Sequence, residues 1–169
     1  GANVVDCGLA STPAMFMTTI SEHVKATASV MVTASHLPFN RNGLKFFTPK
    51  GGLDSKDIAS ILTIAENGEY VFEGEKGSSS TLDFMDIYSR HIADYICEGV
   101  NADDYQHPLK GMHIIVDAGN GNGGFFEKIL SMLGADTKGS QFLDPDGRFP
   151  NHIPNPEDRE AMASVCKGV

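Results

Sequence analysis

The alternation of short apolar runs with helical patterns is the feature that most constrains the fold of this chain. Runs rich in Val, Ile, Phe and Thr predict strands, and apolar residues spaced three or four apart predict helices. The predicted strands are residues 3–7, 28–33, 44–47, 112–117 and 135–142, and the predicted helices are residues 13–23, 55–66, 81–97, a helix ending at 133 and one after 155. This alternation favours an α/β fold, in which helices are layered on a mixed sheet.

Polar residues and glycine mark several helix ends. The Ser-Thr-Pro segment at residues 11–13 predicts a helix start, because hydroxyl caps and a proline in the first turn suit that position. Asp54 or Ser55 is expected to cap the second helix and Gly68 to end it. Asn155 is expected to cap the last helix.

One helix has a clear apolar stripe. Met85, Tyr88, Ile92 and Tyr95 recur at helical spacing and predict the buried face of the helix at residues 81–97.

Two polar segments suggest how the chain is organised. Residues 69–80 are rich in Gly and Ser and predict an exposed connection, and residues 98–109 are acidic and predict a linker. The expected units are residues 1–100 and 105–169, both incomplete.

The first residues already have a strand pattern and the last ones end at or just after a helix. We therefore expect a fragment.

Composition excludes several functional classes. Thirteen basic residues against 22 acidic ones give a net charge of −9, which argues against a nucleic-acid or anionic-membrane surface. No apolar run approaches the roughly 18 residues of a membrane span, and the first residues lack a signal-peptide pattern. Three widely spaced cysteines predict neither a disulfide framework nor a zinc site. These features together favour a reducing cytoplasm.

The segment from Thr33 to Lys45 carries the strongest chemical signal. A strand ends, Ser35 and His36 open the following loop, and Lys45 returns across the Asn42-Gly43 turn signal. Ligands of open α/β sheets bind beyond the carboxyl ends of strands, so the position suits a site. A serine nucleophile needs activation, histidine or lysine can move its proton, and lysine can neutralise phosphoryl oxygens. An ordinary polar surface loop is the alternative.

A second loop, Gly119–Gly124, follows the strand predicted at residues 112–117. Its glycines match the G-x-G-x-x-G pattern of dinucleotide-binding folds, and Asp144 lies 20 residues beyond the last glycine. A dinucleotide-binding module is therefore an alternative function. Close packing of the strand against the helix is the simpler role for these glycines.

The Ser35 segment resembles the phosphoserine loop of the α-D-phosphohexomutases, the phosphoglucomutase/phosphomannomutase family. The family pattern is Thr-Ala-Ser-His-Asn-Pro followed, after a few residues, by Asn-Gly, an apolar residue and Lys, whereas this chain has Leu37 in place of the Asn. The resemblance implies that Ser35 is the phosphorylated serine, that His36 is the active-site histidine, and that Lys45 serves acid/base or phosphoryl contact.

Further segments resemble the same family in the same order. Residues 5–13 resemble its Gly-x-x-(Ser/Thr)-Thr-Pro segment, residues 114–124 the opening of its second domain, and residues 146–157 its proline-rich segment. Arg148 and His152 lie in the last of these. The resemblance implies two phosphohexomutase-type α/β units, domain 1 with its N-terminal part missing and the beginning of domain 2.

The implied activity is isomerisation of hexose 1-phosphate and hexose 6-phosphate through a phosphoserine enzyme and a bisphosphorylated sugar. The implied cofactor is Mg²⁺, bound to the phosphate on Ser35 and to a triple-Asp loop that is expected outside this chain. The expected partner is a phosphosugar, not a nucleic acid or a membrane. The fragment alone is expected to be inactive, and a non-catalytic paralogue or fragment remains an alternative.

Overall fold

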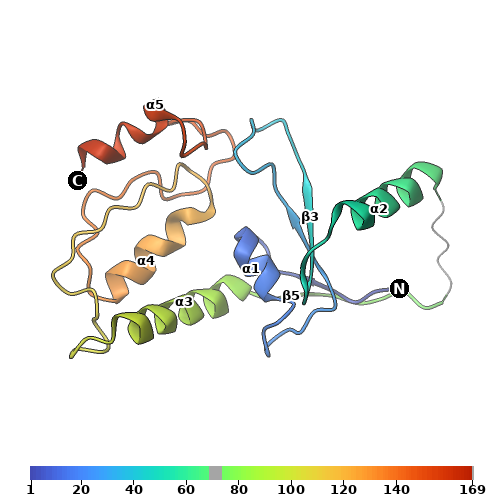
Figure 1. Ribbon diagram of the computed structural model, residues 1–169, viewed down its shortest axis with the longest axis horizontal. Helices are drawn as coiled ribbons and strands as arrows, with labels where there is room; N and C mark the ends of the chain where they lie inside the picture. Colours follow the sequence, from blue (N-terminus) through green and yellow to red (C-terminus); the bar gives the residue numbers. More distant parts are fainter. Residues whose placement is uncertain (69–73, 169) are drawn as a thin grey trace. The chain divides into compact units, whose positions relative to one another are not determined.

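The computed structural model describes residues 1–68 and 74–168 and confirms the mixed α/β class (Figure 1). The chain divides into two compact units, the first made of residues 1–31 and 44–84 and the second of residues 32–43 and those from 85 onward. The segment that contains Ser35 thus belongs to the second unit. The domain boundary expected between residues 100 and 105 stays a proposal.

The first unit begins with a parallel strand pair. Strand β1 (Val4–Asp6) pairs with β5 (Ser79–Thr81), and Val4 lies opposite Ser79. Strand β5 begins in the segment predicted as an exposed connection. Its residues are exposed, as predicted, but they form a strand, which was not predicted. Residues 69–73 of the same segment lie outside the described residues. The pairing with β1 creates this strand, since its Gly- and Ser-rich neighbourhood has little β propensity.

Helix α1 (Thr12–Met17) starts as expected, because the Ser11 hydroxyl accepts the Ala14 N–H at 3.2 Å. It ends several residues before the predicted end. The Thr18 and Thr19 hydroxyls each donate to a backbone carbonyl three residues earlier, both at 2.7 Å. Such local side-chain bonds compete with the backbone hydrogen bonds of a helix, and the residues after Met17 form turns instead.

The second sheet of the first unit has the strand order β2-β3-β4. Its strands are β2 (Ser29–Val32), β3 (Leu44–Thr48) and β4 (Gly51–Gly52), and β3 and β4 run antiparallel. The predicted strands at residues 28–33 and 44–47 are therefore confirmed. They form the two sides of the loop that contains Ser35.

Helix α2 (Ser55–Asn67) has the ends that the sequence predicted. The Asp54 carboxylate accepts the N–H groups of Lys56 and Asp57 at 2.8 and 3.0 Å. Gly68 ends the helix with a φ of 64°, a conformation that glycine adopts without steric cost. None of the residues of α2 is buried.

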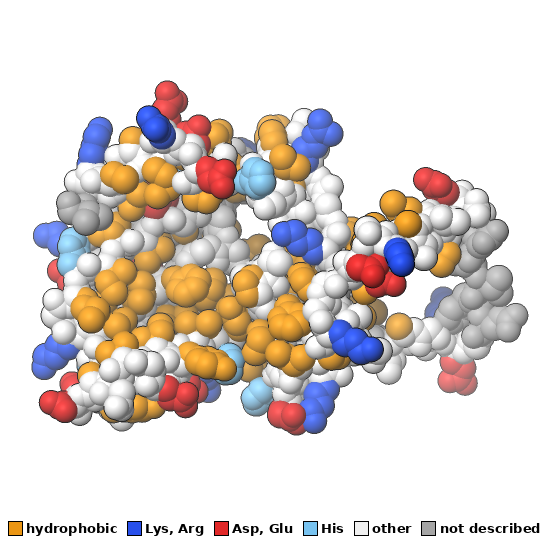
Figure 2. Space-filling view, viewed as in Figure 1, with side chains coloured by type: hydrophobic (Ala, Val, Ile, Leu, Met, Phe, Trp, Pro, Cys, Tyr) orange, Lys and Arg blue, Asp and Glu red, His pale blue; other side chains and the backbone are white. Residues whose placement is uncertain are grey.

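The core of the second unit lies between helix α3 (Phe84–Val100) and helix α4 (Phe125–Met132). The buried residues that form it are Ala93, Cys97, Leu109, Ile129, Leu133 and Ala135. Figure 2 shows hydrophobic side chains gathered over these two helices. Tyr88 is buried as predicted, but Tyr95 is 62% exposed, so its place in the buried stripe was wrong. Ala93 and Cys97 of α3 belong to this core instead, and Tyr95, two residues from each, lies on the other side of the helix.

Two predicted strands of the second unit are reduced to isolated pairings. Residues 112–117 and 135–142 form parallel bridges between His113 and Asp136 and between Asp117 and Gln141. The Gln141 N–H donates to the Val116 carbonyl at 2.8 Å. The segments therefore lie side by side, although neither forms a continuous strand.

The last helices follow a different cap from the predicted one. Helix α5 (Arg159–Met162) is capped by Asp158, which accepts the N–H groups of Glu160 and Ala161 at 3.0 and 2.9 Å. Asn155 instead accepts the Glu157 N–H at 3.1 Å in the preceding turn, so its prediction as the cap was wrong. The single-turn helix η2 (Val165–Lys167) follows α5.

Candidate functional site

The loop of residues 33–43, hereafter the Ser35 loop, is closed at its base by one backbone bond. The Thr33 N–H donates to the Gly43 carbonyl at 2.9 Å. A Cβ added at Gly43 would lie 2.8 Å from the Thr33 carbonyl oxygen, too close for any other residue without a shift of the backbone. The sequence signal Asn42-Gly43 therefore marks a close approach of the two loop ends.

Ser35 has an unusual backbone conformation within this loop. Its φ of 57° lies in the left-handed region, which costs roughly 1–2 kcal/mol for a residue with a Cβ. The Ser35 N–H donates to the Thr33 hydroxyl oxygen at 3.0 Å, so this amide is satisfied inside the loop. The side chain of Ser35 is exposed.

His36 is brought next to Ser35, as the sequence predicted. The Ser35 Oγ lies 3.3 Å from the His36 Nδ1, and both residues are exposed. With the imidazole proton on Nε2, the hydroxyl can donate to Nδ1. Free enzymes often have longer distances between nucleophile and base than their complexes, so this spacing is compatible with proton transfer.

Lys45 lies on β3, two residues beyond the bond that closes the Ser35 loop, and its side chain is exposed. It belongs to the first compact unit, whereas Ser35 belongs to the second. The approach of the Lys45 amine to Ser35 stays a prediction.

Leu37, which replaces the usual Asn of the family pattern, does not disturb the turn. Its N–H donates to the Ala34 carbonyl at 3.1 Å, and its side chain is 48% exposed. Phe39, two residues further on, is 71% exposed. The backbone of the loop is thus formed without a polar side chain at position 37.

The glycine loop Gly119–Gly124 is filled by the chain itself. A Cβ at Gly119 would lie 2.8 Å from the Cε1 of His152, and a Cβ at Gly124 would overlap the Leu143 carbonyl. Gly124 ends the single-turn helix η1 (Asn122–Gly124), directly before α4. Close packing explains these two glycines, which disfavours a dinucleotide at this loop.

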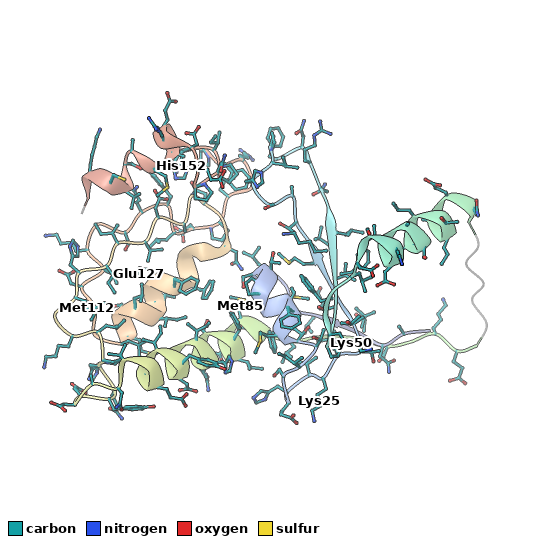
Figure 3. All side chains as sticks on the ribbon, viewed as in Figure 1. Lys25, Lys50, Met85, Met112, Glu127 and His152 are labelled. Atoms are coloured by element: carbon teal, nitrogen blue, oxygen red, sulfur yellow. The ribbon has the colours of Figure 1, made fainter. Side chains whose placement is uncertain are left out.

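His152 lies in the loop that precedes α5, in the second unit, and both nitrogens of its ring contact protein oxygens (Figure 3). Its Nε2 lies 3.1 Å from the Asp117 Oδ1, and its Nδ1 lies 2.8 Å from the Ile153 carbonyl oxygen. The Oδ1 of Asp117 also accepts the Gly119 N–H at 2.9 Å, and its Oδ2 accepts the Gln141 amide at 2.8 Å. No family motif or residue spacing predicted this contact between positions 35 residues apart.

The pKa values of this pair shift in the directions expected for an ion pair. The carbonyl of Ile153 raises the pKa of His152 most, burial opposes this, and Asp117 raises it further. Burial raises the pKa of Asp117, but hydrogen bonds from Gln141, His152 and Gly119 outweigh it and lower that pKa overall. Because both ring nitrogens of His152 already face protein acceptors, this histidine is suited to holding the fold rather than to proton transfer.

The described residues offer little to a metal ion. Within residues 1–68 and 74–168, His, Cys, Asp and Glu side chains form no group of three or more that could hold one. A phosphate on Ser35 would provide oxygen ligands, and Mg²⁺ bound to such oxygens usually takes one or two carboxylates and several waters as well. In the same described part of the chain, no helix has the length and hydrophobicity of a membrane span.

Family comparison covers nearly the whole chain. The family model described as phosphoglucomutase/phosphomannomutase alpha/beta/alpha domain I matches residues 1–71, and the model of domain II of that family matches residues 86–169.

Individual relatives agree with these matches. A phosphoglucomutase of Neisseria meningitidis serogroup B is 33% identical over 170 residues, which cover 100% of this chain and 34% of the relative. A phosphomannomutase of Salmonella typhimurium is 32% identical over 178 residues, which cover 100% of this chain and 37% of the relative. The chain thus spans about a third of the length of the curated relatives it matches.

A solved structure shares the fold. The crystal structure of a phosphoglucomutase/phosphomannomutase family protein from Burkholderia thailandensis matches with a TM-score of 0.75 and 26% sequence identity. The match covers 99% of this chain and 35% of that protein.

Proposed function

The chain belongs to the phosphoglucomutase/phosphomannomutase family, and on that premise we propose that it supplies the phosphoserine loop of a phosphohexomutase. Ser35 is the phosphoryl carrier in this proposal. The observation that supports it most is the exposed Ser35 hydroxyl, 3.3 Å from His36 in a closed loop. The substrate is a hexose phosphate, and the expected location is the cytoplasm.

The proposed reaction has two transfers that balance each other. The bond between Ser35 Oγ and phosphorus breaks as the phosphoryl group joins a free hydroxyl of the sugar phosphate, and the proton of that hydroxyl passes to a base. The bisphosphorylated sugar then reverses its orientation in the site. It returns its other phosphoryl group to Ser35, while the released sugar oxygen takes up a proton. His36 and Lys45 manage the protons, and the Lys45 charge offsets that of the phosphoryl oxygens.

Mg²⁺ would neutralise charge on the phosphate of Ser35. Its other ligands are expected outside this chain, because the described residues provide no cluster for it. For the same reason we expect the 169-residue chain by itself to have little or no mutase turnover.

The proposal is tested with the full-length gene product that contains these residues. Mass spectrometry before and after incubation with glucose 1,6-bisphosphate and Mg²⁺ should locate phosphate on Ser35. Ser35→Ala should abolish both the modification and the interconversion of hexose 1- and 6-phosphates. Ser60→Ala is the matched control, since Ser60 is an exposed serine on α2 whose hydroxyl donates to the Lys56 carbonyl.

Two outcomes would contradict the proposal. One is full mutase activity in Ser35→Ala. The other is a wild-type protein that takes up no phosphate, which would favour a non-catalytic relative. Retention of NAD by the protein, with Ser35 unmodified, would favour the dinucleotide-binding alternative instead.

A further inference from the structure

Thr33 contacts the rest of the Ser35 loop through three of its atoms. Its N–H donates to the Gly43 carbonyl at 2.9 Å, and its side-chain oxygen accepts the Ser35 N–H at 3.0 Å. Its carbonyl oxygen lies against the Cα side of Gly43, where a Cβ would be 2.8 Å away. Thr33 therefore fixes both the base of the loop and the backbone of the residue two positions on.

The side-chain contact of Thr33 matters because of the conformation of Ser35. A non-glycine residue at a φ of 57° tends to relax to a negative φ unless its surroundings hold it. Such a change would rotate the Cα–Cβ bond of Ser35 and move its Oγ away from the His36 Nδ1, 3.3 Å distant. The bond from the Ser35 N–H to the Thr33 hydroxyl opposes this relaxation.

The same local bond occurs at a turn that has no nucleophile. At the end of β3 the Lys50 N–H donates to the Thr48 hydroxyl oxygen at 3.3 Å, and that hydroxyl lies 3.4 Å from the Gly51 carbonyl oxygen. Thr48, at the end of β3, and Thr33, directly after β2 in the sequence, thus make equivalent threonine turns. Only the turn at Thr33 places a reactive hydroxyl, so Thr48 offers a matched control.

We propose that Thr33 is a positioning residue, which holds the Ser35 hydroxyl in the orientation needed to accept and release phosphate. This inference rests on the proposed role of Ser35 as the phosphoryl carrier. Thr33 itself touches neither the sugar nor the phosphate in it. The threonine hydroxyl is the essential group, and the methyl group is dispensable.

The experiment compares Thr33→Val, Thr33→Ser and Thr48→Val in the full-length gene product. Valine keeps the shape and the strand propensity of threonine but removes the hydroxyl, and serine keeps the hydroxyl. Thr33→Val should slow phosphorylation of Ser35 by glucose 1,6-bisphosphate about tenfold, because without this hydrogen bond the competent conformation of Ser35 is populated about tenfold less. The KM for the bisphosphate should stay within about twofold of the wild-type value, since Thr33 does not bind it.

Thr33→Ser, which keeps the hydroxyl, should phosphorylate Ser35 at about the wild-type rate. Thr48→Val should also have the wild-type rate. Thermal unfolding of each variant shows whether it is folded, and Thr33→Ala replaces Thr33→Val if the valine variant unfolds. A wild-type rate in Thr33→Val, or no recovery in Thr33→Ser, would overturn the role of Thr33 alone. Failure of the wild-type protein to take up phosphate would overturn the proposed function and this inference together.

Discussion

The Nε2 of His152 lies 3.1 Å from the Oδ1 of Asp117, and this contact joins the loop before α5 to the segment that ends at the glycine loop. The Nδ1 of the same ring lies 2.8 Å from the Ile153 carbonyl oxygen. Both oxygens can only accept, because one belongs to a backbone carbonyl and the other to a carboxylate whose lowered pKa keeps it ionised at neutral pH. The imidazole satisfies both contacts when it carries a proton on each nitrogen.

This geometry predicts how stability depends on pH. The pKa of folded His152 is raised above the ordinary value near 6.5, by the Ile153 carbonyl first and by Asp117 and Asp158 as well. Its stabilising contribution should be complete below about pH 6.5 and should disappear as the pH rises through the folded-state pKa. His152→Gln should therefore lower the free energy of unfolding by about 1–2 kcal/mol at pH 6 and by less at pH 9.

Urea unfolding between pH 5.5 and 9 measures this difference. His23→Gln is the control, since His23 is exposed and lies in the first compact unit. A constant gap between wild type and His152→Gln across this range would contradict the ion pair. Below this range the contribution of Asp117 to stability depends on pH in the opposite direction. Because the pKa of folded Asp117 is lowered, its contribution disappears as the pH falls through that pKa.

Gly43→Ala should damage the Ser35 loop. The added Cβ would lie 2.8 Å from the Thr33 carbonyl oxygen, so the loop base must open. We expect a loss of about 1–3 kcal/mol of stability and slower phosphorylation of Ser35. Gly52→Ala is the control, because Gly52 lies in β4 and its Cβ would be at an ordinary 3.8 Å from the Phe46 carbonyl oxygen. Equal melting temperatures for the two variants would count against this close approach.

Gly124→Ala should destabilise the second unit, because its Cβ would overlap the Leu143 carbonyl. Gly123→Ala, one residue earlier in η1, would meet the Ala118 Cβ at 3.5 Å and should be tolerated. We expect a difference of about 2 kcal/mol between the two variants in chemical unfolding. If both melt like the wild type, packing does not explain the glycine, and a ligand at this loop regains support.

Lys45→Met should reduce the turnover of the full-length gene product about 10²- to 10⁴-fold, if the amine moves a proton or stabilises the phosphoryl group as proposed. Lys50→Met is the control, because Lys50 is also an exposed lysine of the first unit (Figure 3). The measurement is steady-state interconversion of glucose 1- and 6-phosphate. Equal losses in the two variants would show a general charge effect and would remove Lys45 from the mechanism.

Local signals explain why much of the fold followed from the sequence. The Asp54 cap and the Gly68 end of α2 each depend on residues within one helical turn, and both were predicted. The exposure of Tyr95 and the pairing of β5 with β1 were not predicted. Both depend on segments distant in the sequence, which no local pattern identifies.

The candidate site divides in the same way. Residue order alone placed Ser35 and His36 side by side, because adjacent residues at the start of a loop have little room to separate. The positive φ of Ser35 and its bond to Thr33 depend on how the loop ends meet at Gly43, which sequence spacing does not specify.

The sequence by itself determined the α/β class, the family and the serine that the phosphoryl group is proposed to use, because these follow from short patterns of neighbouring residues. Only the tertiary structure decided that Asp117 meets His152 and that Thr33 holds the Ser35 backbone. The contact between Asp117 and His152 forms because packing brings positions 35 residues apart to within hydrogen-bond distance. The bond from Ser35 to Thr33 is local, but it requires the positive φ of Ser35, which no sequence pattern specifies.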